Sequence, residues 1–557
     1  MQRSQMGQTE GSAPTGPLVG EVANGQHGMV ATDAALATEV GVRVLQDGGN
    51  AADATIATAF AMAVVYPEAG NIGGGGFIVA HFADGSNTTI DFREVAPLQA
   101  TRDMYVGADG KVTRKSLTGH LASGVPGAVA GLYEFHRKHG SKPWRELLQP
   151  AIKLAREGFV VDEHLHKRIA DDKRLKDFPG SAALLLPNGA PLTIGSTWKN
   201  PDLANVLQRV ADRGRDGFYK GETADLIVAE MKRGGGLISH EDLANYQAKW
   251  RAPIEFDYRG HRIVAMAPAS SGGITVAIMA GILDGFNLKA LGPHSVERYH
   301  LIAEASRRAF ADRNALLGDP DFIKVPQTEL LSKEYLAKLR AGISRERATP
   351  SKEVRPSLAQ SQEGAHTTHL SFVDSKGNTV AFTTTLNELH GSAVTVTGGG
   401  FLLNDEMDDF TAKVGAANMF GLVQGPNNSI APGKRMLSAM TPTIVLNTDG
   451  STLLVTGARG GPRIISAVFQ IISNVLDHGM SFPQALTEKR IHMQHLPDSL
   501  YHESDAFDAE TTRRLEAMGH HVTKRAGSIG SATAILRVAG GWVGMADPRS
   551  GGLAAGY

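Results

Sequence analysis

The stretch TTHLSFVDSKGNTVAFTTTLN, residues 367–387, holds two runs of alternating apolar and polar residues on either side of a glycine turn. This pattern predicts two antiparallel strands joined by a tight hairpin. If residues 375–377 form a three-residue loop with Gly377 in the left-handed region, Asp374 pairs with Asn378. The hairpin is the centre from which the fold can be read outward.

Two threonines face each other at the open end of this predicted hairpin, because counting outward from the turn places Thr385 opposite Thr367. A hydroxyl beside Thr367 would orient its Oγ. If the chain were cut before Thr367, the freed α-amine, with a pKa of about 8, could act as its general base. The pair therefore predicts a threonine nucleophile, and the alternative is that threonine-rich strands reflect β propensity alone.

Charged and polar residues fill the segment that leads into the hairpin, SKEYLAKLRAGISRERATPSKEVRPSLAQSQEG, residues 332–364. It begins as a plausible exposed helix and ends rich in proline and serine, which predicts a solvated linker. Strands are normally entered through a tight turn, so a linker that runs directly into Thr367 marks an unusual junction.

The composition is that of an ordinary folded protein: 557 residues, 42% hydrophobic and 20% charged. A formal charge of -1 offers no basic field for a nucleic acid or an anionic membrane surface. The absence of cysteine excludes disulfides, thiolate metal sites and a cysteine nucleophile. The most apolar window, residues 54–66, is shorter than the roughly 20 residues that a membrane-spanning helix needs.

Earlier parts of the chain predict helices and a second hairpin. Helical periodicity from Asp33 ends at Gly48, and residues 51–65 predict another helix. FIVAHF (77–82) and TTIDF (88–92) predict two strands around an Asp-Gly turn. The middle of the chain, about residues 132–314, has a mainly helical pattern.

Two motifs suggest ligands but lack the expected context. GGGG (73–76) does not open a βαβ unit with an acidic residue about 20 positions later, so close backbone packing near the site explains it better than a nucleotide. The chain has 20 histidines but no HExxH motif. We expect no catalytic metal and no cofactor.

An ordered series of motifs resembles the γ-glutamyltranspeptidases, which are N-terminal-nucleophile hydrolases, over nearly the whole chain. The motifs are NIGGGGF (71–77), DFRE (91–94), LTGHLASGVPG (117–127), PASSGG (268–273), LGDPDF (317–322), TTH (367–369), LLNDEMDDF (402–410) and GGPRI (460–464). The resemblance implies an α/β fold, a four-layer αββα sandwich, and a precursor that cleaves itself between His366 and Thr367. Residues 1–30 would be a leader, 31–366 the large subunit and 367–557 the small subunit of a heterodimer.

The resemblance also implies the catalytic roles. Thr367 would be the nucleophile, Thr385 would support its hydroxyl, and Gly460 and Gly461 would donate backbone N–H groups to the oxyanion. The alternative for the glycine pair is a plain turn.

The substrate-binding residues follow from the same motifs. Arg93, with Ser438 and Ala439, would hold the substrate α-carboxylate, and the group formed by Asn387, Glu406 and Asp409 would hold the α-ammonium. The alternatives are a surface salt bridge of Arg93 with Glu94, and a solvated acidic turn or calcium loop at residues 406–409.

Two positions depart from the family pattern. Ala439 stands where the family usually has a second serine, so one hydroxyl near the α-carboxylate is missing. Residues 411–426 match a lid loop, in which Phe420 replaces a tyrosine that often hydrogen-bonds across the pocket.

The implied substrates are glutathione and other γ-glutamyl amides, with water, amino acids or dipeptides as acceptors. A periplasmic or secreted location is also implied, although the first 16 residues contain no apolar stretch typical of a signal peptide. One alternative is a self-processing amidohydrolase or cephalosporin-type acylase without γ-glutamyl specificity. Another is a non-catalytic solute-binding protein.

Overall fold

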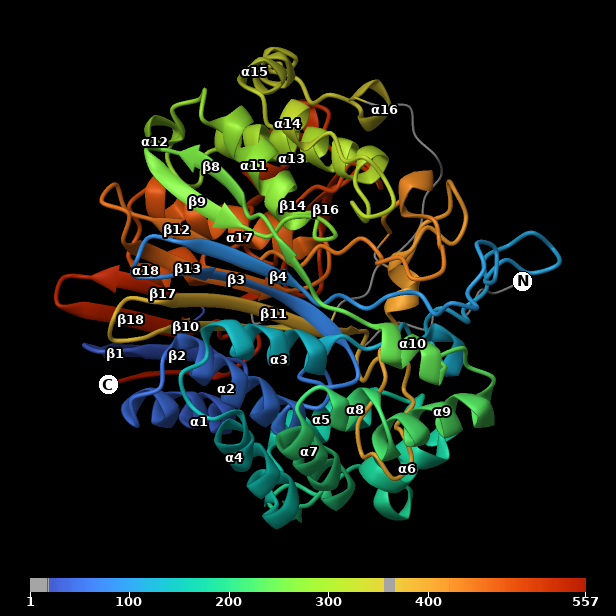
Figure 1. Ribbon diagram of the computed structural model, residues 1–557. Coiled ribbons are helices and arrows are strands. Elements are labelled where there is room, and N and C mark those ends of the chain that lie inside the picture. Colours follow the sequence, from blue (N-terminus) through green and yellow to red (C-terminus); the bar gives the residue numbers. More distant parts are fainter. Residues whose placement is uncertain (1–17, 19, 355–365, 420) are drawn as a thin grey trace.

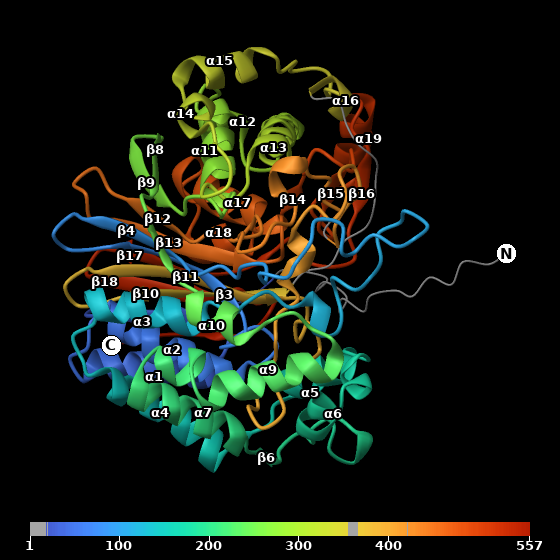
Figure 2. The same ribbon diagram turned by 45° about the vertical axis from the view of Figure 1, so that its right-hand side comes forward.

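A computed structural model describes residue 18 and residues 20–354, 366–419 and 421–557. Two seven-stranded sheets lie face to face, and helices cover the outer face of each (Figure 1). The layers also separate in the turned view of Figure 2, with the sheets between an upper and a lower group of helices. This arrangement is the predicted four-layer αββα sandwich.

The first sheet is antiparallel throughout and has the predicted hairpin at its centre. In spatial order its strands are β19 (Leu553–Gly556), β2 (Met29–Thr32), β10 (His366–Val373), β11 (Thr379–Asn387), β3 (Gly75–His81), β4 (Asn87–Asp91) and β7 (Lys249–Arg251). The β3–β4 pair is the second predicted hairpin.

The second sheet lies against β10 and β11 through its central strand β13. In spatial order its strands are β1 (Val22–Gly25), β18 (Gly541–Ala546), β17 (Ser531–Val538), β13 (Thr452–Arg459), β12 (Thr443–Leu446), β9 (His261–Ala265) and β8 (Ile254–Tyr258).

Helices α1 (Ala35–Gln46) and α2 (Ala51–Val65) cover the first sheet and confirm both N-terminal helix predictions. A capping box at the start of α2 links Asn50 and Asp53, and every residue of α2 is buried. The small alanine side chains let α2 pack between the sheet and α4 (Trp144–Glu157), which in turn packs against α7 (Pro201–Arg213). Helix α3 (Ala128–His139) contacts α2 and also β3 and β4 of the same sheet.

The second sheet is covered by α11 (Gly272–Leu283), α13 (Val296–Leu316), α15 (Lys333–Ala341) and α17 (Arg463–Leu476). The remaining helices of four or more residues are α5 (Glu163–Asp171), α6 (Pro179–Leu185), α8 (Asp216–Tyr219), α9 (Glu222–Gly234), α10 (His240–Asn245), α12 (Leu288–Leu291), α14 (Gln327–Leu330), α16 (Ser351–Val354), α18 (Phe482–Thr487) and α19 (Ala509–Ala517). Short strands β5 (Phe159–Val160) and β6 (Thr197–Trp198) pair with each other, and β14 (Ile491–His492), β15 (Leu500–His502) and β16 (Val522–Lys524) form a third sheet.

Strand alternation divides the apolar core into two parts. Met29 and Phe77 belong to the cluster shared with the second sheet and its helices. Their neighbours Val30 and Ile78, like Leu370 of β10, belong to the cluster formed with α1 and α2. Because successive strand residues point to opposite faces, the first sheet is apolar on both faces and is buried as an inner layer.

The described residues include parts of two segments identified from the sequence. The stretch assigned to the leader, residues 1–30, contains β1, which pairs with β18, and the first residues of β2, which pairs with β10 and β19. The linker begins with α15 as predicted, but Ser351 within it is only 1% exposed, and its N–H donates to Asp498 Oδ2 at 2.8 Å. That part is anchored rather than solvated, and residues 355–365 lie outside the described residues.

Within the described part of the chain, no helix combines the length and apolar character needed to cross a membrane.

Candidate active site

The hairpin has the register predicted from its turn. The Asp374 N–H donates to the Asn378 carbonyl at 3.0 Å, and Gly377 has φ +87°. Thr367 is paired with Thr385, and the Thr367 hydroxyl donates to Thr385 Oγ1 at 3.3 Å. The backbone N–H of Asn387 donates to that same oxygen at 2.8 Å, which orients it within the strand.

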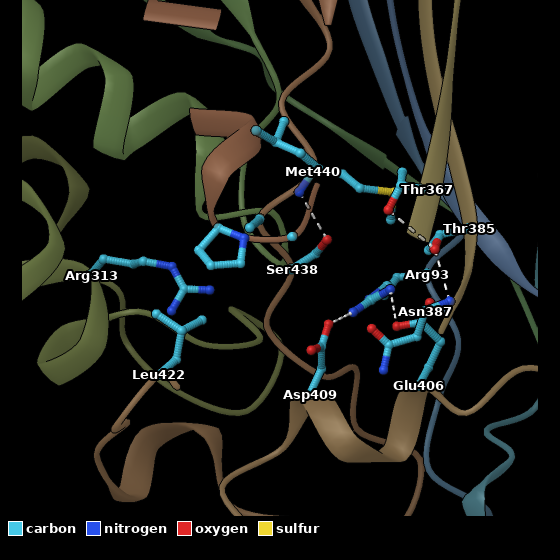
Figure 3. Close-up of a pocket in the computed structure, with 14 residues that line it drawn as sticks. Arg93, Arg313, Thr367, Thr385, Asn387, Glu406, Asp409, Leu422, Ser438 and Met440 are labelled. Atoms are coloured by element: carbon cyan, nitrogen blue, oxygen red, sulfur yellow. Dashed lines mark hydrogen bonds and ion pairs between the residues drawn. The ribbon is translucent and has the colours of Figure 1, made fainter. Parts of the chain in front are cut away.

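A pocket lies beside this threonine pair (Figure 3). It is lined by Arg93, Arg313, Thr367, Thr385, Asn387, Glu406, Asp409, Leu422, Ser438, Ala439, Met440, Gly461, Pro462 and Ile464. The pocket thus brings together nine of the residues proposed from the sequence, although they come from segments far apart in the chain. Gly460 is absent from this set of described lining residues.

Arg93 follows strand β4 and is buried, with 1% of its surface exposed. Its guanidinium forms ion pairs with Glu406 and Asp409, and its Nη1 lies 3.5 Å from Glu94 Oε2. Its Nε also donates to the Met436 carbonyl at 3.4 Å. The alternative of a surface salt bridge is therefore wrong, since the whole cluster is buried.

The acidic segment at 406–409 is likewise not a solvated turn. It forms a short 3₁₀ helix, η4 (Glu406–Asp409), in which Glu406 is 0% and Asp409 7% exposed. Both side chains turn inward to Arg93, as Figure 3 shows. The arginine neutralises part of the charge that would otherwise keep this segment in solvent.

One guanidinium cannot fully compensate three buried carboxylates, and the pKa values reflect this. Burial raises the pKa of Glu94 to about 7, against the lowering effect of Arg93. Burial also raises the pKa of Glu406 and of Asp409, again opposed by Arg93. Burial by itself would lower the pKa of Arg93, but the charges of Glu406 and Asp409 raise it, so Arg93 stays charged.

Asn387 ends strand β11 with φ +82°, which turns its side chain toward the acidic segment. Its amide nitrogen donates to the Asp405 carbonyl at 3.1 Å and approaches the Met419 sulfur at 3.4 Å. With the amide nitrogen used in this way, the side-chain oxygen is the atom that Asn387 can offer to a cation.

The glycine pair connects β13 to α17. Gly460 has φ +130° and Gly461 φ +57°, and a Cβ built at Gly460 would lie 3.1 Å from the Gly530 Cα. Because Gly461 lines the pocket close to the start of a 14-residue helix, the helix dipole favours negative charge at this end of the site.

Ser438 and Ala439 form another part of the pocket wall. The Ser438 carbonyl accepts hydrogen bonds from the N–H of Ser271 at 2.7 Å and from its hydroxyl at 2.6 Å. The Met440 N–H donates to Ser438 Oγ at 3.1 Å, which leaves the Ser438 hydroxyl proton able to donate to a ligand.

The segment 411–426 packs against the acidic side of the pocket. Leu422 lines the cavity, the Met419 N–H donates to Asp408 Oδ2 at 2.9 Å, and Gln424 Nε2 donates to the Asp409 carbonyl at 3.1 Å. Phe420, singled out from the sequence, lies outside the described residues.

The glycine run 73–76 has the packing role expected of it. A Cβ at Gly74 would lie 2.2 Å from the Thr385 carbonyl oxygen, and one at Gly76 would lie 2.4 Å from that of Thr383. Because glycine has no side chain, the backbone at the start of β3 can approach β11 this closely.

Sequence reasoning missed five lining residues. Met440 and Pro462 are direct neighbours of positions that it identified, and Ile464 ends the GGPRI motif, so adjacency could have suggested all three. Leu422 lies within residues 411–426, the segment that matches a lid loop. Arg313 carried no such signal, since it looks like one of several charged residues of a long helix.

The stacked antiparallel sheets, with a threonine at the start of a central strand and a charged pocket beside it, define an N-terminal-nucleophile hydrolase. The sequence model of the gamma-glutamyltranspeptidase family matches residues 37–557, and the chain belongs to this family of enzymes.

Individual relatives agree with this assignment. The chain is 47% identical to a glutathione hydrolase proenzyme of Pseudomonas sp. (strain A14), over 89% of this chain and 86% of the relative. It is 44% identical to the glutathione hydrolase proenzyme of Escherichia coli (strain K12), over 96% of this chain and 92% of the relative. Among solved structures, cephalosporin acylase from Bacillus halodurans superposes with a TM-score of 0.85 at 27% identity, over 99% of both chains.

Proposed function

We propose that this enzyme cleaves its own chain at Thr367 and then transfers the γ-glutamyl group of glutathione and related amides to water, amino acids or dipeptides. The observation that carries the proposal is the pocket itself, in which a paired threonine hydroxyl and a buried arginine–carboxylate cluster lie together. A γ-glutamyl amide has a reactive carbonyl at one end, which matches the threonine hydroxyl. Its other end is zwitterionic and matches the arginine–carboxylate cluster.

In self-cleavage, the Thr367 hydroxyl attacks the carbonyl carbon of His366. A C–O ester bond forms as the C–N bond between the two residues breaks, and the hydroxyl proton passes to the freed amine. Water then hydrolyses the ester, which releases the His366 carboxylate and restores the Thr367 hydroxyl.

In turnover, the Thr367 α-amine takes the proton of its own hydroxyl while Oγ1 attacks the γ-carbonyl. Thr385 supports the hydroxyl, and the N–H groups of Gly460 and Gly461 stabilise the oxyanion. The C–N bond breaks, the proton goes to the leaving amine, and water or an acceptor amine then takes the acyl group from the ester.

Substrate binding exchanges one set of ion pairs for another. The substrate α-ammonium takes the carboxylates of Glu406 and Asp409 and the oxygen of Asn387. Arg93, released from those carboxylates, takes the α-carboxylate together with Ser438 and the backbone at Ala439. Because a zwitterion brings both charges at once, the exchange leaves no buried charge without a partner.

The two products of cleavage, residues 1–366 and 367–557, would stay associated as large and small subunits. Support comes from the first sheet, where β19 and β10 pair with β2, and β11 pairs with β3, so that strands from both sides of the cut share one sheet. Separating the subunits would break both inner sheets. By resemblance to the family, we assign the enzyme to the periplasm or the exterior of the cell.

An acylase without γ-glutamyl specificity is the second candidate, and Ala439 favours it, since one expected hydroxyl is missing from the α-carboxylate side of the pocket. The retained Arg93, Asn387 and Asp409 favour the γ-glutamyl function. The two candidates differ in whether removing the α-ammonium or α-carboxylate from the substrate abolishes turnover.

The test is incubation of the purified chain, a denaturing gel and N-terminal sequencing of the smaller band. We expect two fragments, a new N-terminus at Thr367, and glutamate release from glutathione. Thr367→Ala should remain full length and inactive. A wild-type chain that stays whole, like Thr367→Ala, would exclude both the mechanism and the enzymatic candidates in favour of a non-catalytic binding protein.

A further inference from the structure

Arg313, near the end of α13, is a buried cation in the pocket wall that the mechanism above does not use. It is 1% exposed, and among the described residues it forms no ion pair with a carboxylate. Burial lowers its pKa to about 10, partly offset by the charge of Asp409. At neutral pH the guanidinium therefore remains charged without a counterion in contact.

The contacts of Arg313 are with neutral oxygens. Its Nε donates to Ser271 Oγ at 2.9 Å, and its Nη1 donates to Asn314 Oδ1 at 2.9 Å and to Gln424 Oε1 at 3.4 Å. These bonds orient the group but do not neutralise it. In Figure 3 the guanidinium points into the pocket, from the side opposite Thr367.

Arg93 and Arg313 differ in what they can offer a ligand. Arg93 is engaged by Glu406 and Asp409, so a ligand carboxylate must displace one of them. The hydrogen bonds of Arg313 described above use its Nε and Nη1 but not its Nη2. A buried cation without an ion-pair partner is stabilised strongly when an anion binds to it. A carboxylate brought by a ligand would supply the missing counterion.

The position suits the far end of a γ-glutamyl group. When the γ-carbonyl is at Thr367, the α-carboxylate lies at the other end of a short carbon chain, on the side of Ser438 and Ala439. Arg313 also holds the Ser271 hydroxyl that donates to the Ser438 carbonyl, so it adjoins this wall directly.

We propose that Arg313 is a second guanidinium for the substrate α-carboxylate, binding it from the side where Ala439 offers no hydroxyl. The inference rests on the proposed γ-glutamyl function and deepens it. It makes Arg313 a specificity-determining residue that selects donors carrying an α-carboxylate.

The test compares two chromogenic substrates in wild type and Arg313→Met. γ-Glutamyl-p-nitroanilide carries the α-carboxylate, and 4-aminobutyryl-p-nitroanilide keeps the amine but lacks the carboxylate. We expect kcat/KM for the first substrate to fall at least tenfold in Arg313→Met, and for the second to change less than threefold. The ratio of the two values is the readout.

A matched control is Arg298→Met, on the same helix. Arg298 is also buried, has a lowered pKa because of burial, and donates to the Pro293 carbonyl and to Asn474 Oδ1, away from the pocket. This variant should lose stability without changing the substrate ratio. Self-cleavage on a denaturing gel reports folding for every variant.

Equal losses on both substrates in Arg313→Met would make Arg313 structural and overturn the inference, as would an unchanged ratio. If Arg313→Met does not fold, the same comparison of substrates in Arg313→Lys tests the inference. Lysine keeps the charge but has one nitrogen in place of three, so the ratio should fall at least threefold, and a wild-type ratio refutes the inference. A wild-type enzyme inactive on γ-glutamyl-p-nitroanilide would instead refute the proposed function.

Discussion

Replacing Arg93 tests the charge cluster most directly. Arg93→Met removes the guanidinium that pairs with Glu406 and Asp409 and lies 3.5 Å from Glu94. At an effective dielectric constant of about 20, one pair of unit charges at that distance is worth about 5 kcal/mol. The stranded carboxylates escape part of this cost by binding protons, so we expect a loss of about 3 to 5 kcal/mol in the free energy of unfolding.

The pH dependence of this loss has a definite sign. A carboxyl group whose pKa is higher in the folded than in the unfolded state contributes stability below the unfolded value, and loses it as pH rises through the folded value. Glu94 already has a folded pKa of about 7, and removal of Arg93 would raise it further, together with those of Glu406 and Asp409. Arg93→Met should therefore lose stability between about pH 5 and pH 8 more steeply than the parent protein.

The assay is urea unfolding at pH 5 and pH 8 in the Thr367→Ala background, so that both proteins are uncleaved single chains. Arg93→Lys, in the active background, keeps the charge but cannot bind both carboxylates in fork geometry. It should retain self-cleavage while kcat/KM for γ-glutamyl-p-nitroanilide falls at least tenfold. Equal stability of Arg93→Met and its parent at both pH values would refute the charge argument. Parallel loss of cleavage and turnover in Arg93→Lys would refute the binding role.

Two further predictions concern the same pocket. Ala439→Ser should add one hydrogen bond to the α-carboxylate, worth roughly 1.5 to 3 kcal/mol at best. Steady-state kinetics should show a lower KM for γ-glutamyl-p-nitroanilide with little change in kcat. The control substrate is 4-aminobutyryl-p-nitroanilide, which lacks the carboxylate and should show no gain. Because burial raises the pKa of Glu406 and Asp409, lowering the pH should protonate them and weaken binding of the α-ammonium. The acid limb of kcat/KM should therefore be steeper for γ-glutamyl-p-nitroanilide than for glutaryl-p-nitroanilide, which lacks the ammonium, and identical limbs would contradict the assigned roles.

Local features were predictable from the sequence because they depend on short-range geometry. The loop residue Gly377 sets the register of the hairpin, and that register alone places Thr385 beside Thr367. The capped start of α2 at Asn50 and the alternation of β3 are likewise determined within a few residues.

The burial and ion pairing of each charged group could be seen only in the tertiary structure, because both depend on residues distant in sequence. Arg93 looked equally like a surface residue, and only the fold brings it to Glu406 and Asp409, more than 300 positions later. The same reason explains why Arg313 was missed: its helix shows nothing unusual in sequence, and its lack of a counterion exists only once the pocket is closed around it. The sequence by itself determined the pairing of Thr367 with Thr385, through strand register. The long-range packing of two sheets decided which charges line the pocket, since electrostatic energy depends on distance and solvent exclusion.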